Sequence, residues 1–187
     1  MRLLFSMANL SDEIQRLEDL ISELSDPSFL QGHVVAVNDA TALLKNRILN
    51  EKKDAKGSSF GTYSDTKIPS FFFYGKSLSK SAEDKIKNGD PFASYKDLRK
   101  ANNLPVDKKN YSFSGEMLQD VGVISVTREE YSSSVTIGGQ TERSKKLLKY
   151  NSERDDVNLL EPSESEIQLV SDAANERILN VLDKYYE

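Results

Sequence analysis

The stretch VGVISVT at residues 121–127, followed by YSSSVTI at residues 131–137, decides the fold class. The first stretch is β-branched almost throughout, and the second alternates large and small residues with the period of two that is typical of a half-buried strand. Together they predict an antiparallel β-hairpin. Glu129-Glu130 is not a favoured two-residue turn, so the register of the hairpin stays open. Gly138-Gly139 ends the predicted sheet.

Helical periodicity flanks this hairpin on both sides. Upstream, a first helix is expected to begin at a Ser11 cap and to end at Asp26-Pro27, and a longer helix is expected over residues 33–54. Residues 94–103 favour a short helix before the hairpin, and residues 141–150 favour one after it. The apolar stripes of the first two helices are Ile14, Leu17, Ile21 and Leu24, and Val34, Val37, Thr41, Leu44 and Ile48.

The last predicted helix has the clearest start signal. Pro162-Ser163-Glu164-Ser165-Glu166 is a capping box preceded by proline. The stripe that follows comprises Ile167, Val170, Ala174, Ile178, Val181 and Tyr185. No heptad run long enough for a coiled coil is expected.

The stretch between residues 57 and 81 follows neither period, and we expect a long extended loop there. Its aromatic block has two open interpretations, a buried strand or an intersubunit contact. The candidate interaction residues are Phe71, Phe72, Phe73, Tyr74, Lys76 and Lys80.

The predicted fold is therefore α+β. A small antiparallel β-sheet or hairpin packs with a long N-terminal helix and a C-terminal helix, and a long extended loop interrupts them. A chain of 187 residues is interpreted as an N-terminal arm, residues 1–10, and a single domain, residues 11–187. Met7 is a second candidate start.

The amino-acid composition excludes several classes of protein and of chemistry. No apolar run approaches 18 residues, so we expect neither a membrane-spanning helix nor a membrane partner, and we expect a cytosolic setting. The absence of cysteine excludes disulfides and thiolate nucleophiles. The formal charge is −5, but residues 45–109 hold 15 basic against 8 acidic residues. The basic region and the acidic remainder of the chain suit docking against charged neighbours, including copies of the chain. The alternative is that both are merely solvated surface.

Catalytic chemistry finds no support in the motifs. His33 is the single histidine, and Ser114-Gly115 lacks the surrounding Gly-x-Ser-x-Gly of a hydrolase. The stretch at residues 57–61 lacks the Gly-Lys-Ser/Thr ending of a phosphate loop. Acidic pairs such as Asp155-Asp156 are adjacent, and adjacent side chains face different ways. We therefore expect no enzyme, no catalytic residue, no cofactor and no metal.

Nucleic-acid binding is the alternative function. In the basic region, residues 45–109, lysines that can neutralise phosphates alternate with aromatic rings that can stack on bases. The sequence pI of about 5.1 is low for a dedicated binder. The alternative is a cytosolic nucleic-acid-associated accessory protein. The residues concerned are Lys76, Lys80, Lys85, Lys87, Lys96, Arg99 and Lys100, with Tyr74, Phe92 and Tyr95.

The run YSFSGEMLQDV at residues 111–121 resembles a segment of tailed-bacteriophage virion-morphogenesis proteins, a family of neck, tail-completion and tail-terminator components. In that family a long helix and a variable loop precede the segment, a β-hairpin follows it, and a C-terminal helix closes the chain. Residues 33–186 can be laid on that order. The expected structural motif is Phe113 buried, Ser114 as a cap, Gly115 at a close turn, and Met117 and Leu118 packed under the hairpin.

The resemblance implies a structural virion protein that forms a ring, a hexamer or a dodecamer, at the neck or tail terminus. Its partners would be copies of itself and other phage neck and tail-tube proteins, with DNA passing through the channel. It would be located in the virion after assembly in the host cytoplasm. The loop containing the Phe71 to Tyr74 block would then be an arm that reaches a neighbour or lines the channel.

Overall fold

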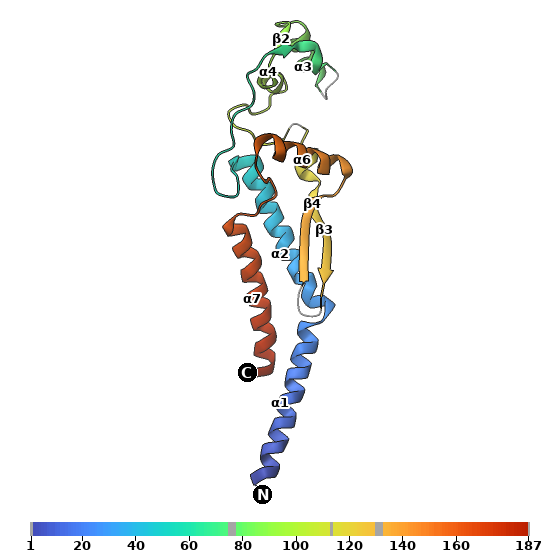
Figure 1. The fold of residues 1–187 in the computed structure, drawn as a ribbon, viewed down its shortest axis with the longest axis vertical. Helices are drawn as coiled ribbons and strands as arrows, with labels where there is room; N and C mark the ends of the chain where they lie inside the picture. The colour runs from blue at the N-terminus through green and yellow to red at the C-terminus, as the bar shows by residue number, and fades with distance from the viewer. Residues whose placement is uncertain (1, 75–77, 113, 130–132, 187) are drawn as a thin grey trace. The chain divides into compact units, whose positions relative to one another are not determined.

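The computed structural model describes residues 2–74, 78–112, 114–129 and 133–186 and confirms the α+β class (Figure 1). Lys76 and Phe113 lie outside the described residues. The elements in chain order are α1 (Arg2–Leu24), α2 (Pro27–Asn46), the π-helical turn η1 (Arg47–Glu51), β1 (Ile68–Pro69), the 3₁₀ turn η2 (Ser70–Phe73), α3 (Lys80–Lys87), β2 (Phe92–Ala93), α4 (Tyr95–Ala101), α5 (Glu116–Gln119), β3 (Val121–Arg128), β4 (Ser133–Gly139), α6 (Glu142–Asp155) and α7 (Glu164–Tyr186).

Two small antiparallel sheets supply the β structure. The hairpin β3–β4 occupies the two stretches that the alternating pattern predicts, so that prediction is confirmed (Figure 1). The second sheet pairs β1 with β2, with Ile68 opposite Ala93 and Pro69 opposite Phe92. Its strands have two residues each, too few for any periodicity, and the sequence therefore did not predict it.

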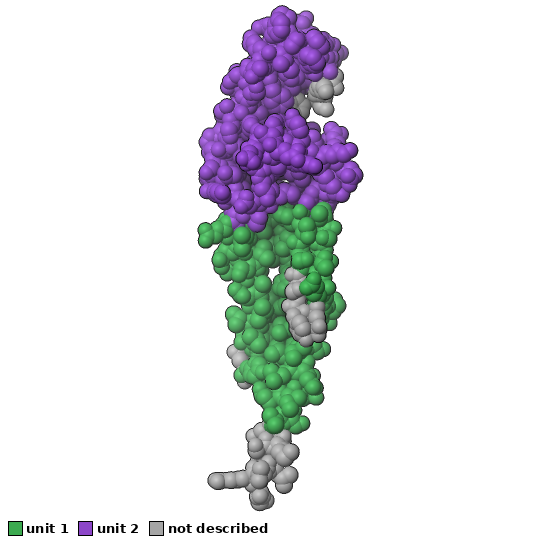
Figure 2. Space-filling model, in the orientation of Figure 1, with its two compact units in different colours: residues 1–42, 123–137, 164–187 green, residues 43–122, 138–163 purple. Residues whose placement is uncertain are grey.

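The chain forms two compact units, shown in different colours in Figure 2. Unit 1 comprises residues 1–42, 123–137 and 164–187, and unit 2 comprises residues 43–122 and 138–163. The sequence suggested a single domain from residue 11 onward. Each unit is described separately below.

In unit 1, α1 packs against α7, and the contact has a polar end. Glu23 forms an ion pair with Lys184, and its Oε2 accepts a hydrogen bond from the Tyr185 hydroxyl at 3.0 Å. The start of α2 contacts α7 through Arg177, which donates to the Ser28 carbonyl oxygen at 3.1 Å. Gly32 permits this approach, because a β-carbon there would collide with the Arg177 guanidinium.

Two predicted helix starts are wrong. The first helix begins at Arg2, so Ser11 lies inside α1 and the expected arm, as far as it is described, is helical. The second begins at Pro27, where the missing proline N–H is harmless because first-turn N–H groups have no helical partner. Asp26 Oδ1 accepts the Ser28 N–H at 2.7 Å. The predicted boundary between the two helices at Asp26-Pro27 is confirmed.

The second helix also ends earlier than predicted. After Asn46 it loosens into the π-helical turn η1, and Lys52 ends it with a left-handed backbone, φ 58°. The predicted stripe is buried over its second half, where Thr41, Leu44 and Ile48 are almost fully covered. The Thr41 hydroxyl donates back to the Val37 carbonyl oxygen at 2.7 Å, which satisfies it within the helix.

Unit 2 contains most of the buried residues of the described chain. One cluster joins Phe73, Ile86, Ala93 and Leu98, which come from η2, α3, β2 and α4. The predicted long loop is therefore partly ordered into β1, η2 and the start of α3. Ser94 caps α4 in a capping box with Asp97, which confirms the short helix expected there.

The C-terminal helices lie where the sequence places them. Thr141 caps α6 by accepting the Ser144 N–H at 3.2 Å, and α6 continues beyond the predicted end to Asp155. The last helix, α7, begins directly after Ser163, at the predicted site. Within the described ranges, no helix combines the length and apolarity that crossing a membrane requires.

Candidate functional site

Arg99, on α4, is the central side chain of a buried polar network in unit 2, and 1% of its surface is exposed. Its nitrogens donate to the carbonyl oxygens of Pro105 and Ser112 at 2.8 and 2.6 Å, and to Asn110 Oδ1 at 3.1 Å. The guanidinium also lies 4.0 Å from the centroid of the Tyr63 ring. The Tyr63 hydroxyl donates to Asn110 Oδ1 and accepts the Asn110 N–H. Because a buried cation requires matched acceptors, this network fixes the loop that follows α4.

A second cluster surrounds Asp155 at the end of α6. Its Oδ1 accepts from Lys109 Nζ at 2.6 Å, and its Oδ2 accepts from Arg154 at 2.9 Å. Burial acts to raise the pKa of Asp155, but the hydrogen bonds from Arg154, Lys109 and Tyr111 outweigh it and lower the pKa to about 2. Burial, together with the bond to Asp155, raises the pKa of Tyr111. The carboxylate therefore stays charged and the phenol stays neutral over the ordinary pH range.

Tyr111 has an unfavourable backbone conformation. Its φ of 53° lies in the left-handed region, which bulky residues rarely adopt. The ring packs edge to face on Phe60, with 4.8 Å between the ring centroids, and the hydroxyl is bonded to Asp155. Tertiary contacts therefore hold a conformation that local preference disfavours.

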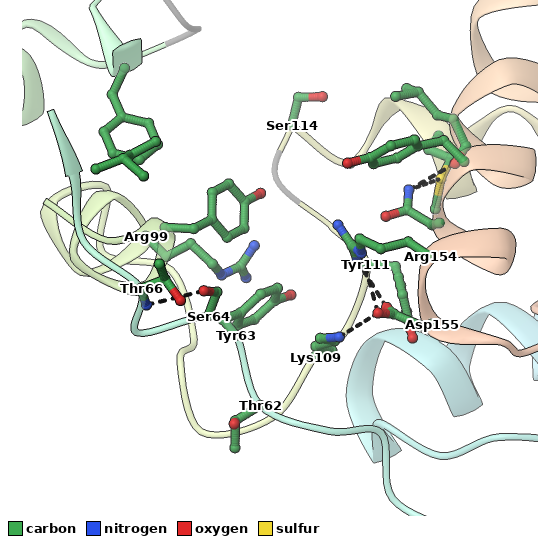
Figure 3. A pocket seen from close by; sticks show the side chains of 18 residues that line it. Thr62, Tyr63, Ser64, Thr66, Arg99, Lys109, Tyr111, Ser114, Arg154 and Asp155 are labelled. Atoms are coloured by element: carbon green, nitrogen blue, oxygen red, sulfur yellow. Dashed lines mark hydrogen bonds and ion pairs between the residues drawn. The ribbon is translucent and has the colours of Figure 1, made fainter. Parts of the chain in front are cut away.

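A cavity of about 820 Å³ lies beside these two clusters (Figure 3). Its walls include the tyrosine rings and the charged side chains already described, and each of those charges is bonded to a neighbour. Tyr111 and Asp155 are poorly matched for proton transfer, because the carboxylate has a pKa of about 2 and the pKa of the phenol is raised. The polar groups of the cavity thus hold its walls together.

The predicted aromatic block is divided between core and surface. Phe73 is buried in the core of unit 2, as the core interpretation predicts. Phe71 and Phe72 are 59% and 55% exposed, and their rings stack with 4.5 Å between centroids. Tyr74 is partly exposed, with Lys87 Nζ 5.4 Å from its ring, and Lys80 is exposed at the start of α3. The surface therefore retains the residues that a contact would need.

The sequence named Phe92 only for the nucleic-acid alternative and did not place it beside the aromatic block. Ile68 on β1 and Phe92 on β2 are also exposed, and the pairing of β1 with β2 brings their strands next to η2. The β1–β2 pairing gave no readable sequence signal. We define the aromatic patch as Phe71, Phe72, Tyr74 and Phe92. Ile68 lies opposite Ala93 and therefore faces the other side of the strand pair from Phe92, where it lines the cavity.

Residues 111–121, as far as they are described, form a turn and the short helix α5 in unit 2. Gly115, with φ 83°, is the N-cap of α5, so the predicted Ser114 cap is wrong. Met117 and Leu118 are buried, and α5 packs against α6. Asp120 bonds to the Thr141 N–H and hydroxyl at 2.7 and 2.8 Å, which ties the end of α5 to the start of α6.

Unit 1 differs from unit 2 in what it exposes. The predicted stripe of α1 lies largely on the surface, with Ile14, Leu17 and Ile21 between 44% and 60% exposed. Of the predicted α7 stripe, Val181 is buried while Ile167 and Ile178 are exposed. These predicted stripes are therefore only partly covered within the chain. Further exposed apolar side chains of unit 1 are Leu10 on α1, Ile124 and Val126 on β3, and Leu179 on α7.

Six of the fifteen basic residues in the basic region, residues 45–109, are paired with carboxylates of the described chain. Carboxylates lie 2.6–3.6 Å from the ammonium groups of several of its lysines, so these charges are less available to phosphates. The pairs are Lys52–Asp107, Lys53–Glu51, Lys67–Asp90, Lys87–Glu83, Lys96–Asp65 and Lys109–Asp155.

Among the residues that the structure describes, no group of three or more potential metal ligands is found.

Comparison with known proteins gives no relative: no family model, no curated protein and no solved structure matches this chain.

Proposed function

We propose that the chain is a structural subunit of a tailed-phage virion. Copies of it assemble into a ring at the neck or tail terminus and join head to tail. The observation that carries this proposal is the apolar surface of unit 1. Among the described residues, unit 1 exposes twelve large hydrophobic side chains and buries three hydrophobic residues. Large contiguous apolar patches are rare on monomeric proteins and mark interaction surfaces, and the exposed apolar side chains along one face of α1 are the candidate for such a patch.

The resemblance at residues 111–121 supports the phage context. That segment builds a short helix that is fixed to α6 by Asp120, with the hairpin directly after it. Such a role is architectural and agrees with the part that the segment plays in the order of elements of the phage family. The bonded state of the charges around the cavity likewise favours a structural over a catalytic role.

The ion pairs in the basic region favour assembly over the nucleic-acid alternative. A nucleic-acid surface gains affinity from lysines that release counterions from phosphates. Lysines already paired with carboxylates contribute less, because each pair must be broken or shared. A ring could still carry DNA through its channel without binding it tightly.

The test is the assembly state of the purified protein. Light scattering and negative-stain imaging, alone and with phage tail-tube subunits, should show rings of one size. Ile14→Asp should weaken the rings because it places a charge in the exposed stripe, whereas the control Gln15→Asp adds the same charge to a neighbouring exposed position of α1. A monomer at every concentration, unresponsive to tail proteins, would contradict the proposal.

A second measurement distinguishes the proposed assembly role from the nucleic-acid alternative. Fluorescence anisotropy with labelled DNA or RNA at low salt should show no binding by a chain whose role is assembly. Salt-dependent binding by a protein that forms no ring would favour the nucleic-acid accessory function instead.

A further inference from the structure

Four large apolar side chains are exposed along one face of α1, where they could contact another surface. We define the seam as Leu10, Ile14, Leu17 and Ile21, which are 44–61% exposed. Their spacing of four, three and four residues places them on one side of the helix, as in a heptad repeat. The neighbouring Leu20, by contrast, is buried in unit 1. The seam is therefore separate from the contact that α1 already makes with α7.

The charges of α1 disfavour a second α1 as the occupant of the seam. Residues 2–24 hold five acidic and two basic residues. In a parallel helix pair, Glu13 of one copy would face Glu18 of the other across the edge of the seam, and like charges there are destabilising. The seam is better matched by a surface that is both apolar and basic.

The aromatic patch of unit 2 has that composition. Phe71, Phe72 and Phe92 are each at least half exposed. The stretch that carries the patch, residues 67–101, holds eight basic against four acidic residues. Lys80, Lys85 and Lys100 are exposed, and none of them forms an ion pair with a residue in the described part of the chain.

We propose that the seam of one copy docks on the aromatic patch of another copy. Leu and Ile side chains cover the phenylalanine rings, while Glu13 and Glu18 face Lys80 and Lys85. The two surfaces are different, so the contact is heterologous, and successive copies form a ring if the rotation closes. This inference rests on the proposed self-assembly and names the surfaces that carry it.

Site-specific cross-linking tests the pairing, because the chain has no cysteine and a single introduced thiol is unique. Ile14→Cys and Phe72→Cys proteins are purified separately, mixed, and treated with a short bis-maleimide. Peptide mapping should identify a cross-link between positions 14 and 72, which can only be intermolecular in this mixture. The control replaces Phe72→Cys by Ser171→Cys, an exposed position on α7, and should give no such product.

The other outcomes overturn the inference in distinguishable ways. A product that joins position 14 to position 14 would show that α1 pairs with itself. Absence of any cross-link from position 14 in a preparation that still forms rings would reject this interface and leave the proposed function intact. A preparation that stays monomeric would reject both.

Charge reversal gives an independent test. Glu13→Lys with Glu18→Lys should weaken association about tenfold, and Lys80→Glu with Lys85→Glu should do the same. Mixing the two reversed proteins should restore rings, because both contacts in the mixture then join opposite charges. If the substitutions had only damaged their own surfaces, the mixture would form pairs through the one native contact and no ring. The control Asp172→Lys with Asp183→Lys makes the same change of charge on α7. Equal weakening by this control, or no restoration in the mixture, would overturn the pairing.

Discussion

Unit 1 and unit 2 differ in how many of their apolar side chains are buried and how many are exposed. Within the described residues, unit 2 buries fifteen hydrophobic residues and exposes seven large ones, whereas unit 1 buries three and exposes twelve. Unit 2 also buries Arg99 with a full set of acceptors. Unit 2 therefore has the larger apolar core, and under the proposed assembly unit 1 would gain much of its stability from contacts with other copies.

The largest expected effect tests whether unit 2 depends on its buried network. Arg99→Met removes the donor to the Pro105 and Ser112 carbonyl oxygens, and each buried acceptor left without a donor is unfavourable, whereas Asn110 Oδ1 keeps its bond from the Tyr63 hydroxyl. We expect the free energy of unfolding to fall by about 3–5 kcal/mol, measured by urea denaturation. The exposed neighbour Lys100→Met should change it by less than about 0.5 kcal/mol. Equal effects would mean that the network contributes little.

Two leucines on one helix sharpen the comparison within unit 1. Leu20 is buried and Leu17 belongs to the seam. Leu20→Ala should lower the free energy of unfolding by about 2–3 kcal/mol at any protein concentration. Leu17→Ala should leave the dilute protein almost unchanged and destabilise it only at concentrations where copies associate. If both variants behaved alike at high dilution, the seam would be part of the fold of a single copy.

The pH dependence of stability tests how much Asp155 contributes to the second cluster of unit 2. Its folded pKa of about 2 lies below the ordinary value of 3.8, so its contribution is complete above pH 4 and is lost as the pH falls towards 2. Asp155→Asn should remove about 2 kcal/mol of stability at neutral pH. The gap between variant and native protein, followed by denaturation at several pH values, should close at low pH. A constant gap would show that the charge is not responsible.

The smallest expected effect concerns His33 in unit 1. Burial and the nearby Arg177 lower the pKa of His33, and among the described groups its Nε2 is a buried atom without a hydrogen-bond partner. The neutral form is therefore favoured in the folded state, and stability should decrease as the pH falls below 6.5. His33→Phe retains a ring beside Phe29 and should flatten this dependence between pH 7.5 and 5.5. A slope unchanged by the substitution would assign it to other groups.

The sequence predicted the hairpin because alternation is a strong local signal, and it predicted α4, α6 and α7 because caps and breakers bound them. It misplaced the start of α1, because Ser11 can cap a helix but the preceding apolar residues extend it. That earlier start also lengthens the apolar repeat, which the sequence alone treated as too short to matter. Gly115 rather than Ser114 caps α5, since the left-handed backbone there suits glycine.

The candidate surfaces were predictable only in part. Phe71 and Phe72 could be singled out because adjacent aromatics are rare in polar loops. Phe92 was named for the nucleic-acid alternative, but its place beside Phe71 and Phe72 was not predictable, because only the pairing of β1 with β2 brings its strand to the patch. Periodicity identified the stripes of α1 and α7 but not their exposure, because an amphipathic pattern is the same whether the covering surface lies in the chain or in a partner.

Hydrogen–deuterium exchange measured at low and high protein concentration tests most directly whether unit 1 is completed by other copies. Amides of α1 around residues 10–21 should become more protected as concentration rises, while those of β3 and β4 serve as a readout of the remaining unit 1 surface. Amides of α6 in unit 2, outside the proposed contact, should not change. Protection of α1 that is the same at every concentration would contradict the account.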